Sequence, residues 1–299
     1  MSLSRFQPGH AQSVLLMMLA TLLWSMAGVV SRQITQAQGF EVTFWRSFFT
    51  ALSLFVGLTL ATRGSVWRWQ TFRSSTLWLS GVCWSVMFTA FMLALTMTTV
   101  ANVLITLSLG PLLTALLHRL WGGQALGKQT WWAIALAAVG MGYMFVSQVQ
   151  LDGGQHLKGM LIAACVPLAG SVQWNLMKTR QASANQQNML PAIFLGSVLS
   201  CCVTLPQAWP FQASVLDIQW LAFLGIFQLA LPCSLAVWSS RVLKPHEVAM
   251  LALLEVLFGI TWAWWGAHEA PSHSVMLGGS LVLMALASNE FFSWRQRHD

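Results

Sequence analysis

Long apolar segments alternate with short polar ones along the whole chain. A helix rises 1.5 Å per residue, so about 20 apolar residues cross the roughly 30 Å hydrocarbon core of a bilayer. Segments of this kind are found at residues 13–31, 41–61, 75–96, 100–120, 129–147, 158–177, 189–208, 218–240, 247–267 and 274–293. The pattern therefore predicts an all-α polytopic membrane protein with ten transmembrane helices joined by short connections.

Composition supports this prediction. The 299 residues are 56% hydrophobic and only 8% charged, whereas soluble domains carry about 25% charged residues. No polar tract is long enough to form a soluble domain. The first segment resembles the apolar core of a signal peptide, but it is long for one and has no clean cleavage site, so we interpret it as the first helix. The expected partners are a lipid bilayer and a small-molecule substrate, and the sequence does not fix the oligomeric state.

The basic residues predict the orientation. The net charge of +7 does not indicate nucleic-acid binding, because the basic residues lie between apolar segments, where they set topology. If both termini are cytoplasmic, the outer loops hold only Arg32 and Lys158, and Arg46 lies within the second helix. The inner segments then hold the other twelve: Arg5, Arg63, Arg68, Arg73, Arg119, Lys128, Lys178, Arg180, Arg241, Lys244, Arg295 and Arg297. This asymmetry predicts a bacterial inner-membrane location with both termini in the cytoplasm.

The two halves of the chain resemble each other weakly. At an offset near 145 residues, Gly110 and Pro111 fall opposite Glu255 and Val256. We therefore expect two five-helix units, residues 1–150 and 151–299. Because five is odd, the second unit enters the membrane from the opposite side, and inverted repeats of this kind place a substrate site near the midplane between the halves.

Several loose motifs fit one known family. They are Trp24, Ser25 and Arg32 in the first helix, the run W-R-S-F-F at 45–49, Ala101, Asn102 and Pro111 in the fourth, and Ala249 and Glu255 in the ninth, followed by Glu269. With these motifs and ten predicted spans, the chain resembles the drug/metabolite transporter superfamily, specifically the EamA-type ten-helix transporters, over essentially its whole length. The resemblance implies export of a small metabolite or drug-like compound, such as an amino acid or an organic cation, by alternating access, with a proton as a candidate coupling partner.

Two residues depart from the family pattern. Val256 follows Glu255 where relatives usually have proline, and Gln124 stands where they usually have glutamate. Without that proline, the resemblance does not imply a kink at Glu255. The second departure concerns a contact in the loop between the fourth and fifth helices.

The charged residues at membrane depth are the first candidates for substrate binding or coupling. Glu255 lies in the middle of the ninth segment, where a carboxylate costs at least about 2.5 kcal/mol. It either exchanges a proton or a cation, or forms a structural bond with a neighbouring helix. Arg46 lies about a turn and a half into the second helix, from which it either reaches the outer interface or points into a cavity.

Amides and tryptophans form a second group of candidates. Asn102, Asn175 and Gln228 either line the cavity or tie helices together, and Asn102 is also placed to cap a helix. Seventeen tryptophans are present, most at predicted segment ends, where interfacial belts form. A cavity lined by the deeper Trp24, Trp84 and Trp174, with Glu255 as counter-charge, would suit an organic cation or an aromatic metabolite; the alternative is ordinary helix packing.

The remaining signals limit other functions. Gly110 and Pro111 mark a candidate hinge, because proline bends a helix. No nucleotide, cofactor or metal motif is present, and none of the five cysteines has metal-ligand spacing. A lipid-modifying enzyme would need a catalytic cluster, and a scaffold would need a partner-binding domain. The main alternative to proton-coupled export is an uncoupled uniporter or exchanger.

Overall fold

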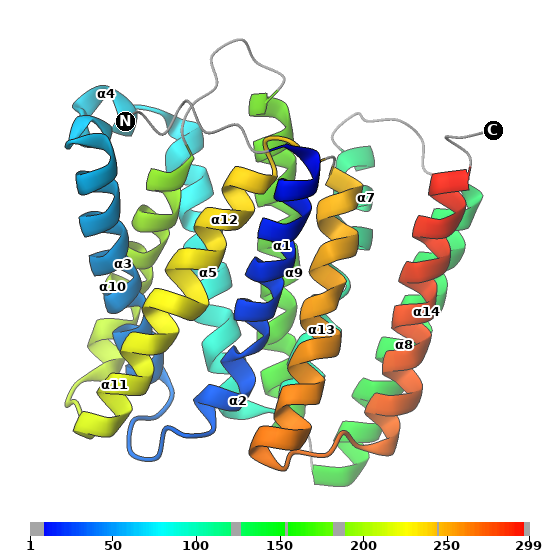
Figure 1. The fold of residues 1–299 in the computed structure, drawn as a ribbon. Helices are drawn as coiled ribbons and strands as arrows, with labels where there is room; N and C mark the ends of the chain where they lie inside the picture. Colours follow the sequence, from blue (N-terminus) through cyan, green and yellow to red (C-terminus); the bar gives the residue numbers. More distant parts are fainter. Residues whose placement is uncertain (1–8, 121–126, 153–154, 182–188, 244, 296–299) are drawn as a thin grey trace.

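The computed structural model describes residues 9–120, 127–152, 155–181, 189–243 and 245–295, and the regular structure in these ranges is helical. The first half contains α1 (His10–Ser25), α2 (Ala27–Ser31), α3 (Phe40–Thr62), η2 (Ser65–Trp67), α4 (Trp69–Phe72), α5 (Ser75–Met97), α6 (Val100–Leu107), α7 (Gly110–Leu120) and α8 (Lys128–Asp152). The second half contains α9 (Gln155–Gln181), α10 (Leu190–Ala208), α11 (Val215–Phe223), η3 (Leu224–Ala230), α12 (Leu231–Ser239), α13 (Pro245–Ala267) and α14 (His273–Arg295). They form one bundle of roughly parallel and antiparallel helices (Figure 1).

Within the described residues, eight helical segments are long and apolar enough to cross a membrane: His10–Ser31, Phe40–Thr62, Ser75–Met97, Val100–Leu117, Lys128–Ser147, His156–Met177, Leu190–Ala208 and Val215–Ser239. Two shorter apolar stretches follow, Leu251–Ala267 and His273–Asn289. The prediction of an all-helical polytopic membrane protein is therefore confirmed. The connection that contains Gln124 lies outside the described residues.

Three of the predicted helices are interrupted. The first breaks at Met26, between α1 and α2, and the fourth breaks between α6 and α7. The eighth contains a π-helical segment, η3, between α11 and α12. Pro232 has no backbone N–H for the carbonyl of Gln228, so the regular bonding pattern cannot continue there. Hydropathy reports length and composition but not these interruptions, which is why the sequence predicted single helices.

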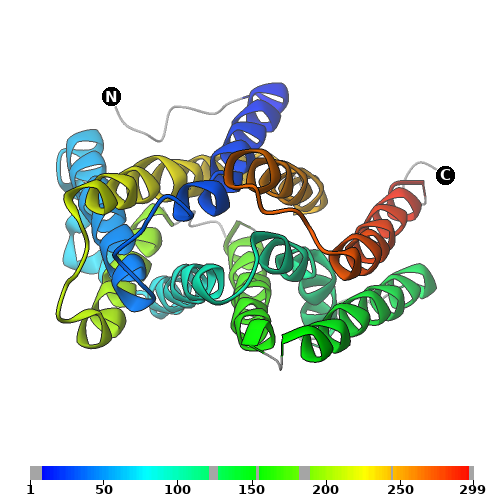
Figure 2. The same cartoon turned by 90° about the horizontal axis from the view of Figure 1, so that it is seen from below.

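Contacts between the two halves build the centre of the bundle. α5 of the first half packs against α9 and α10 of the second, and α3 packs against α10. α1 packs against α12 and α13, while α8 and α14 pair with each other at one side (Figure 2). A site at the centre therefore receives side chains from both halves.

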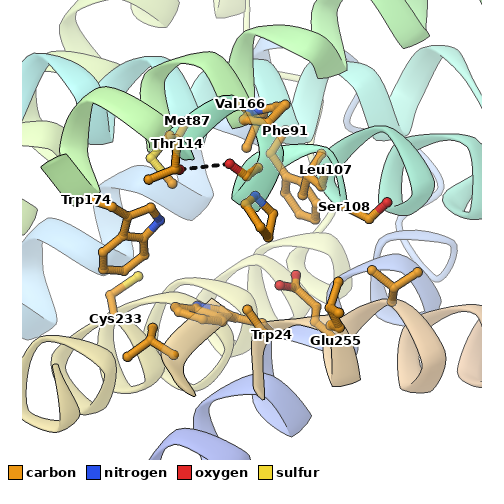
Figure 3. A pocket seen from close by; sticks show the side chains of 18 of the residues that line it. Trp24, Met87, Phe91, Leu107, Ser108, Thr114, Val166, Trp174, Cys233 and Glu255 are labelled. Carbon is orange, nitrogen blue, oxygen red and sulfur yellow. Dashed lines mark hydrogen bonds between the residues drawn. The ribbon is translucent and has the colours of Figure 1, made fainter. Parts of the chain in front are cut away.

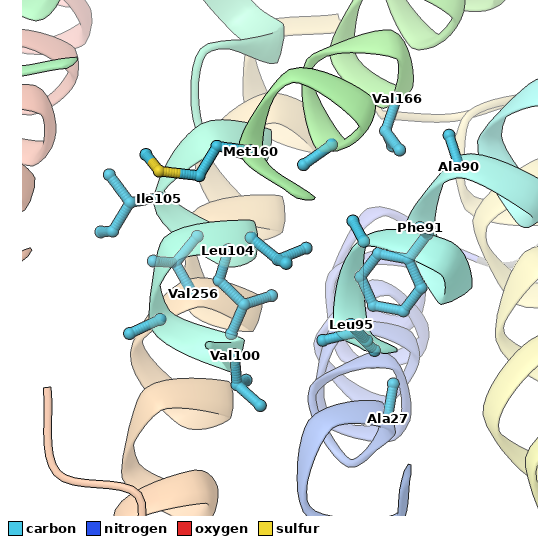
Figure 4. Close-up of a cluster of buried hydrophobic side chains, with 14 of the residues drawn as sticks. Ala27, Ala90, Phe91, Leu95, Val100, Leu104, Ile105, Met160, Val166 and Val256 are labelled. Carbon is cyan, nitrogen blue, oxygen red and sulfur yellow. The ribbon is translucent and has the colours of Figure 1, made fainter. Parts of the chain in front are cut away.

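The bundle has two different ends. We call the end where α1 begins and α14 finishes the terminal end, and the opposite one the far end (Figure 1). Toward the far end, Ala27, Leu95, Val100 and Leu104 belong to one buried apolar cluster (Figure 4). Helices approach closely here, because a Cβ at Gly28 would clash with Val100. The far end is thus filled by side chains.

Candidate functional site

A cavity of about 370 Å³ lies between the two halves (Figure 3). Its walls come from α1, α3, α5, α6 and α7 of the first half and from α9, η3, α12 and α13 of the second. The lining continues to Ser240, Leu243 and Val248 near the terminal end. Among the residues singled out from the sequence, the lining includes Trp24, Arg46, Trp84, Gly110, Pro111, Trp174, Asn175, Gln228 and Glu255.

The helices present a largely aromatic and apolar wall. Trp84, Met87, Phe88 and Phe91 line the cavity from α5, and their spacing of three and four residues places them on one helix face. The Trp174 ring from α9 meets the Trp84 ring edge-on, with 6.4 Å between centroids. Phe91 and Met87 were not predicted, although this helical spacing from Trp84 could have identified them.

The two charged residues lie in different walls of the cavity. Arg46 comes from α3 and is only 2% exposed, and its guanidinium carbon lies 5.5 Å from the centroid of the Phe91 ring. Arg46 therefore does not reach the outer interface. Glu255 comes from α13, which continues without a break through this position. Its side chain lies beside Trp24, across the cavity from Met87 and Phe91 (Figure 3).

The predicted amides separate into two groups. The Gln228 side chain donates from Nε2 to the Trp24 carbonyl at 3.2 Å, at the end of α1. The Asn175 side chain donates from Nδ2 to the Ser171 carbonyl at 2.9 Å and to the Thr114 carbonyl at 3.3 Å. Gln228 and Asn175 both line the cavity and also join helices. Cavity lining and helix joining, stated above as alternatives, therefore both apply to these amides.

Asn102 does not line the cavity. Its backbone N–H donates to Thr99 Oγ1 at 3.2 Å, and its Nδ2 donates to Thr98 Oγ1 at 2.9 Å. Thr99 is the N-cap residue of α6. Asn102 thus belongs to the start of that helix, and the structure separates it from the other candidates.

The predicted hinge lies at a helix break. α6 ends at Leu107, and α7 begins at Gly110 with Pro111 as its second residue. Proline is favoured in the first turn of a helix because its missing N–H has no intrahelical partner there. Both residues line the cavity, so a change of angle at this break would alter the cavity wall.

An ion pair joins three helical segments at the far end. Arg32 Nε donates to Glu269 Oε2 at 2.9 Å. The same guanidinium donates to the carbonyls of Leu95 and Thr98 at the end of α5, at 2.7 and 3.0 Å. Glu269 Oε1 accepts the backbone N–H of Val100 at 2.5 Å, at the start of α6. The pair therefore bridges the loop after α13 to the α5–α6 corner.

Two buried carboxylates that the sequence analysis missed also lie at the far end. Asp217 accepts the backbone N–H groups of Thr35, Gln36 and Ala37 at 3.0 to 3.1 Å. Glu41 accepts those of Gln212 and Ala213 at 2.9 to 3.0 Å. Each carboxylate thus fixes a loop of the opposite half. Their positions close to span ends gave no sign of this role, because the bonded partners are backbone groups far away in sequence.

Metal binding has no support among the residues that the structure describes. They include no cluster of three histidine, cysteine, aspartate or glutamate side chains able to hold a metal ion. The five cysteines are all free thiols.

Comparisons with known proteins identify the family. The model of the EamA-like transporter family matches twice, at residues 11–146 and 157–289. A comparison with curated proteins gave no match. Among 14 similar chains of solved structures, one described as "Crystal structure of protein" has a TM-score of 0.64 at 17% identity, over 96% of this chain and 99% of the other. That likeness concerns the fold alone.

Proposed function

The chain belongs to the EamA-like transporter family, and from this premise we propose that it exports a small organic molecule, an amino acid or an organic cation, by alternating access. The family resemblance predicted from the sequence is thereby confirmed. Members of this family are membrane transporters, not enzymes. The observation that carries the proposal is the cavity between the two halves, whose lining combines aromatic side chains with opposite charges.

The proposed topology has ten membrane-crossing segments in two inverted five-helix units, residues 1–150 and 151–299. Eight long apolar helices and two shorter apolar stretches support the number, and the double match of the family model supports the two units. The distribution of basic residues supports a bacterial inner membrane with cytoplasmic termini. On this topology the terminal end is cytoplasmic and the far end faces outward.

The proposed substrate site consists of Glu255, Arg46, Trp24, Trp84, Trp174, Asn175 and Gln228, with Gly110 and Pro111 as the hinge. The lining reaches Leu243 near the terminal end, while the Arg32–Glu269 pair joins helices at the far end. This arrangement corresponds to a conformation that loads substrate from the cytoplasm. Export would then require the far-end contacts to separate. Asn102 is better explained as part of the start of α6.

Glu255 is the proposed coupling residue. A carboxylate in a cavity of low dielectric is costly in its charged form unless a cation or a proton neutralises it. Exchange of that proton against the substrate would link export to a proton gradient. An uncoupled uniporter or exchanger is the alternative, and it requires no titration of Glu255.

Transport into proteoliposomes tests this proposal. Wild type and Glu255→Gln are compared with and without a pH gradient, using a panel of aromatic amino acids and a panel of organic cations. We expect the pH gradient to drive accumulation by wild type. Under the same gradient, Glu255→Gln should transport at least about tenfold more slowly than wild type, since a neutral amide cannot exchange a proton. Arg63→Gln, at the end of α3 and outside the cavity lining, is the control and should behave as wild type.

Normal transport by Glu255→Gln with unchanged pH dependence would contradict the coupling role and favour the uncoupled alternative. Failure of wild type to move any compound of either panel would contradict the proposed function itself.

A further inference from the structure

Arg46 is a buried cation. Its Nε and Nη1 atoms are buried without a hydrogen-bond partner among the described residues. Phe91 flanks the guanidinium, but a ring face accepts no conventional hydrogen bond from it. Arginine stays protonated in proteins, so it cannot escape this cost by losing its charge. The unmet donors are therefore suited to an anionic group that enters the cavity.

Glu255 supplies the complementary charge without satisfying Arg46. Both residues line the cavity, yet these described residues form no ion pair within 4.0 Å, whereas Arg32 and Glu269 do at 2.9 Å. When Glu255 is ionised, its charge and that of Arg46 give the cavity a net charge of zero. A ligand that carries both charges keeps it at zero too.

The uncharged residues of the lining also supply both a hydrogen-bond donor and a hydrogen-bond acceptor. Within the part of the chain that the structure describes, Trp84 Nε1 is a buried donor without a partner, and Gln228 Oε1 is a buried acceptor without one. Donors on Arg46 and Trp84 suit a carboxylate, while acceptors on Gln228 and Glu255 suit an ammonium group. An unpaired buried polar atom destabilises the protein, so a ligand that pairs with several of these atoms binds more tightly.

We propose that the transported molecule is a zwitterion with a large apolar body, its carboxylate bound by Arg46 and its ammonium group by Glu255. The apolar body lies against Trp24, Trp174 and Met87. A ligand that is only a cation leaves the donors of Arg46 unmet and is repelled by its charge. This inference rests on the proposed function, because it takes the cavity as the substrate site, and it selects the amino acid over the organic cation.

Three matched probes test the assignment on the purified full-length protein in nanodiscs, by isothermal titration calorimetry. L-Phenylalanine carries both charges, 2-phenylethylamine lacks the carboxylate, and 3-phenylpropionate lacks the ammonium group. Wild type should bind L-phenylalanine at least about tenfold more tightly than either analogue. Because this comparison changes the ligand, it needs no variant to fold.

The variants then assign each charge to its residue. Arg46→Gln should bind L-phenylalanine no better than 2-phenylethylamine, and Glu255→Gln should bind it no better than 3-phenylpropionate. Arg46→Lys, which keeps the charge but loses the forked donors, should retain part of the preference. Arg63→Gln should retain all of it. If Arg46 and Glu255 had only a structural role, their substitution would weaken the binding of all three probes equally.

Equal binding of L-phenylalanine and 2-phenylethylamine by wild type overturns the proposal, as does the absence of binding by all three probes. If organic cations move through wild type in proteoliposomes while the zwitterion neither binds nor moves, this inference fails and the proposed transport stands. If neither panel moves, the proposed function fails as well.

Discussion

The charged residues at the far end of the bundle differ from those in the central cavity in whether the protein satisfies their hydrogen-bonding groups. At the far end, Glu41 and Asp217 accept several backbone N–H groups each, and Arg32 bonds Glu269 and two carbonyls. In the central cavity, the Nε and Nη1 atoms of Arg46 have no partner in the described part of the chain. Charges that the protein satisfies hold its structure together, whereas charges left unmet reduce stability and are available to a ligand.

The largest stability change is expected at Asp217, which is fully buried and bonded to the backbone N–H groups of two loops. Asp217→Ala removes the acceptor and leaves those donors unpaired, a loss of about 3–5 kcal/mol by analogy with broken buried pairs. Thermal unfolding in detergent should show Tm lower by roughly 6 °C or more. The Tm of Asp217→Asn, which keeps one acceptor oxygen, should lie between those of wild type and Asp217→Ala. An Asp217→Ala protein as stable as wild type would remove the distinction drawn between the two regions.

Removal of the charges in the cavity is expected to leave stability unchanged or to raise it, in contrast to Asp217. The double variant Arg46→Met, Glu255→Leu removes one buried and one partly buried charge that do not form a close pair, and replacement of buried ions by apolar side chains is often neutral or stabilising by about 1–4 kcal/mol. Its Tm should equal or exceed that of wild type, while transport is lost.

Single variants are the control for this experiment. Arg46→Met alone leaves Glu255 without its opposite charge and should be less stable than the double variant. If the double variant unfolds well below wild type, the cavity charges are structural, and the comparison between the two regions fails.

A smaller effect is expected for the Arg32–Glu269 pair, because its side chains are 31% and 17% exposed and partly exposed pairs contribute about 1 kcal/mol or less. Arg32→Gln and Glu269→Gln should each lower Tm slightly, and the double variant should lose less than their sum, since the residues share one interaction. A double-mutant cycle on Tm measures this coupling. Strict additivity would show that the pair does not hold the far end closed.

The sequence located the charged and amide residues that line the cavity, for a physical reason. A charge or an amide in a long apolar segment is costly against lipid, so it must face the interior. That argument singled out Arg46, Gln228 and Glu255, all of which line the cavity. Asn102 does not line the cavity, because it lies near a helix start, where its Nδ2 donates to Thr98 Oγ1; its Oδ1 has no partner among the described residues.

The sequence by itself determined the helical membrane fold and its family, since hydropathy over about 20 residues and the family motifs are local properties of the chain. Only the tertiary structure decided which charges are satisfied. Asp217 bonds a loop about 180 residues earlier in the chain, whereas Nε and Nη1 of Arg46 find no partner in the described ranges of the chain. Such pairings depend on which segments meet across the bundle, and no local pattern of residues shows which distant segments come into contact.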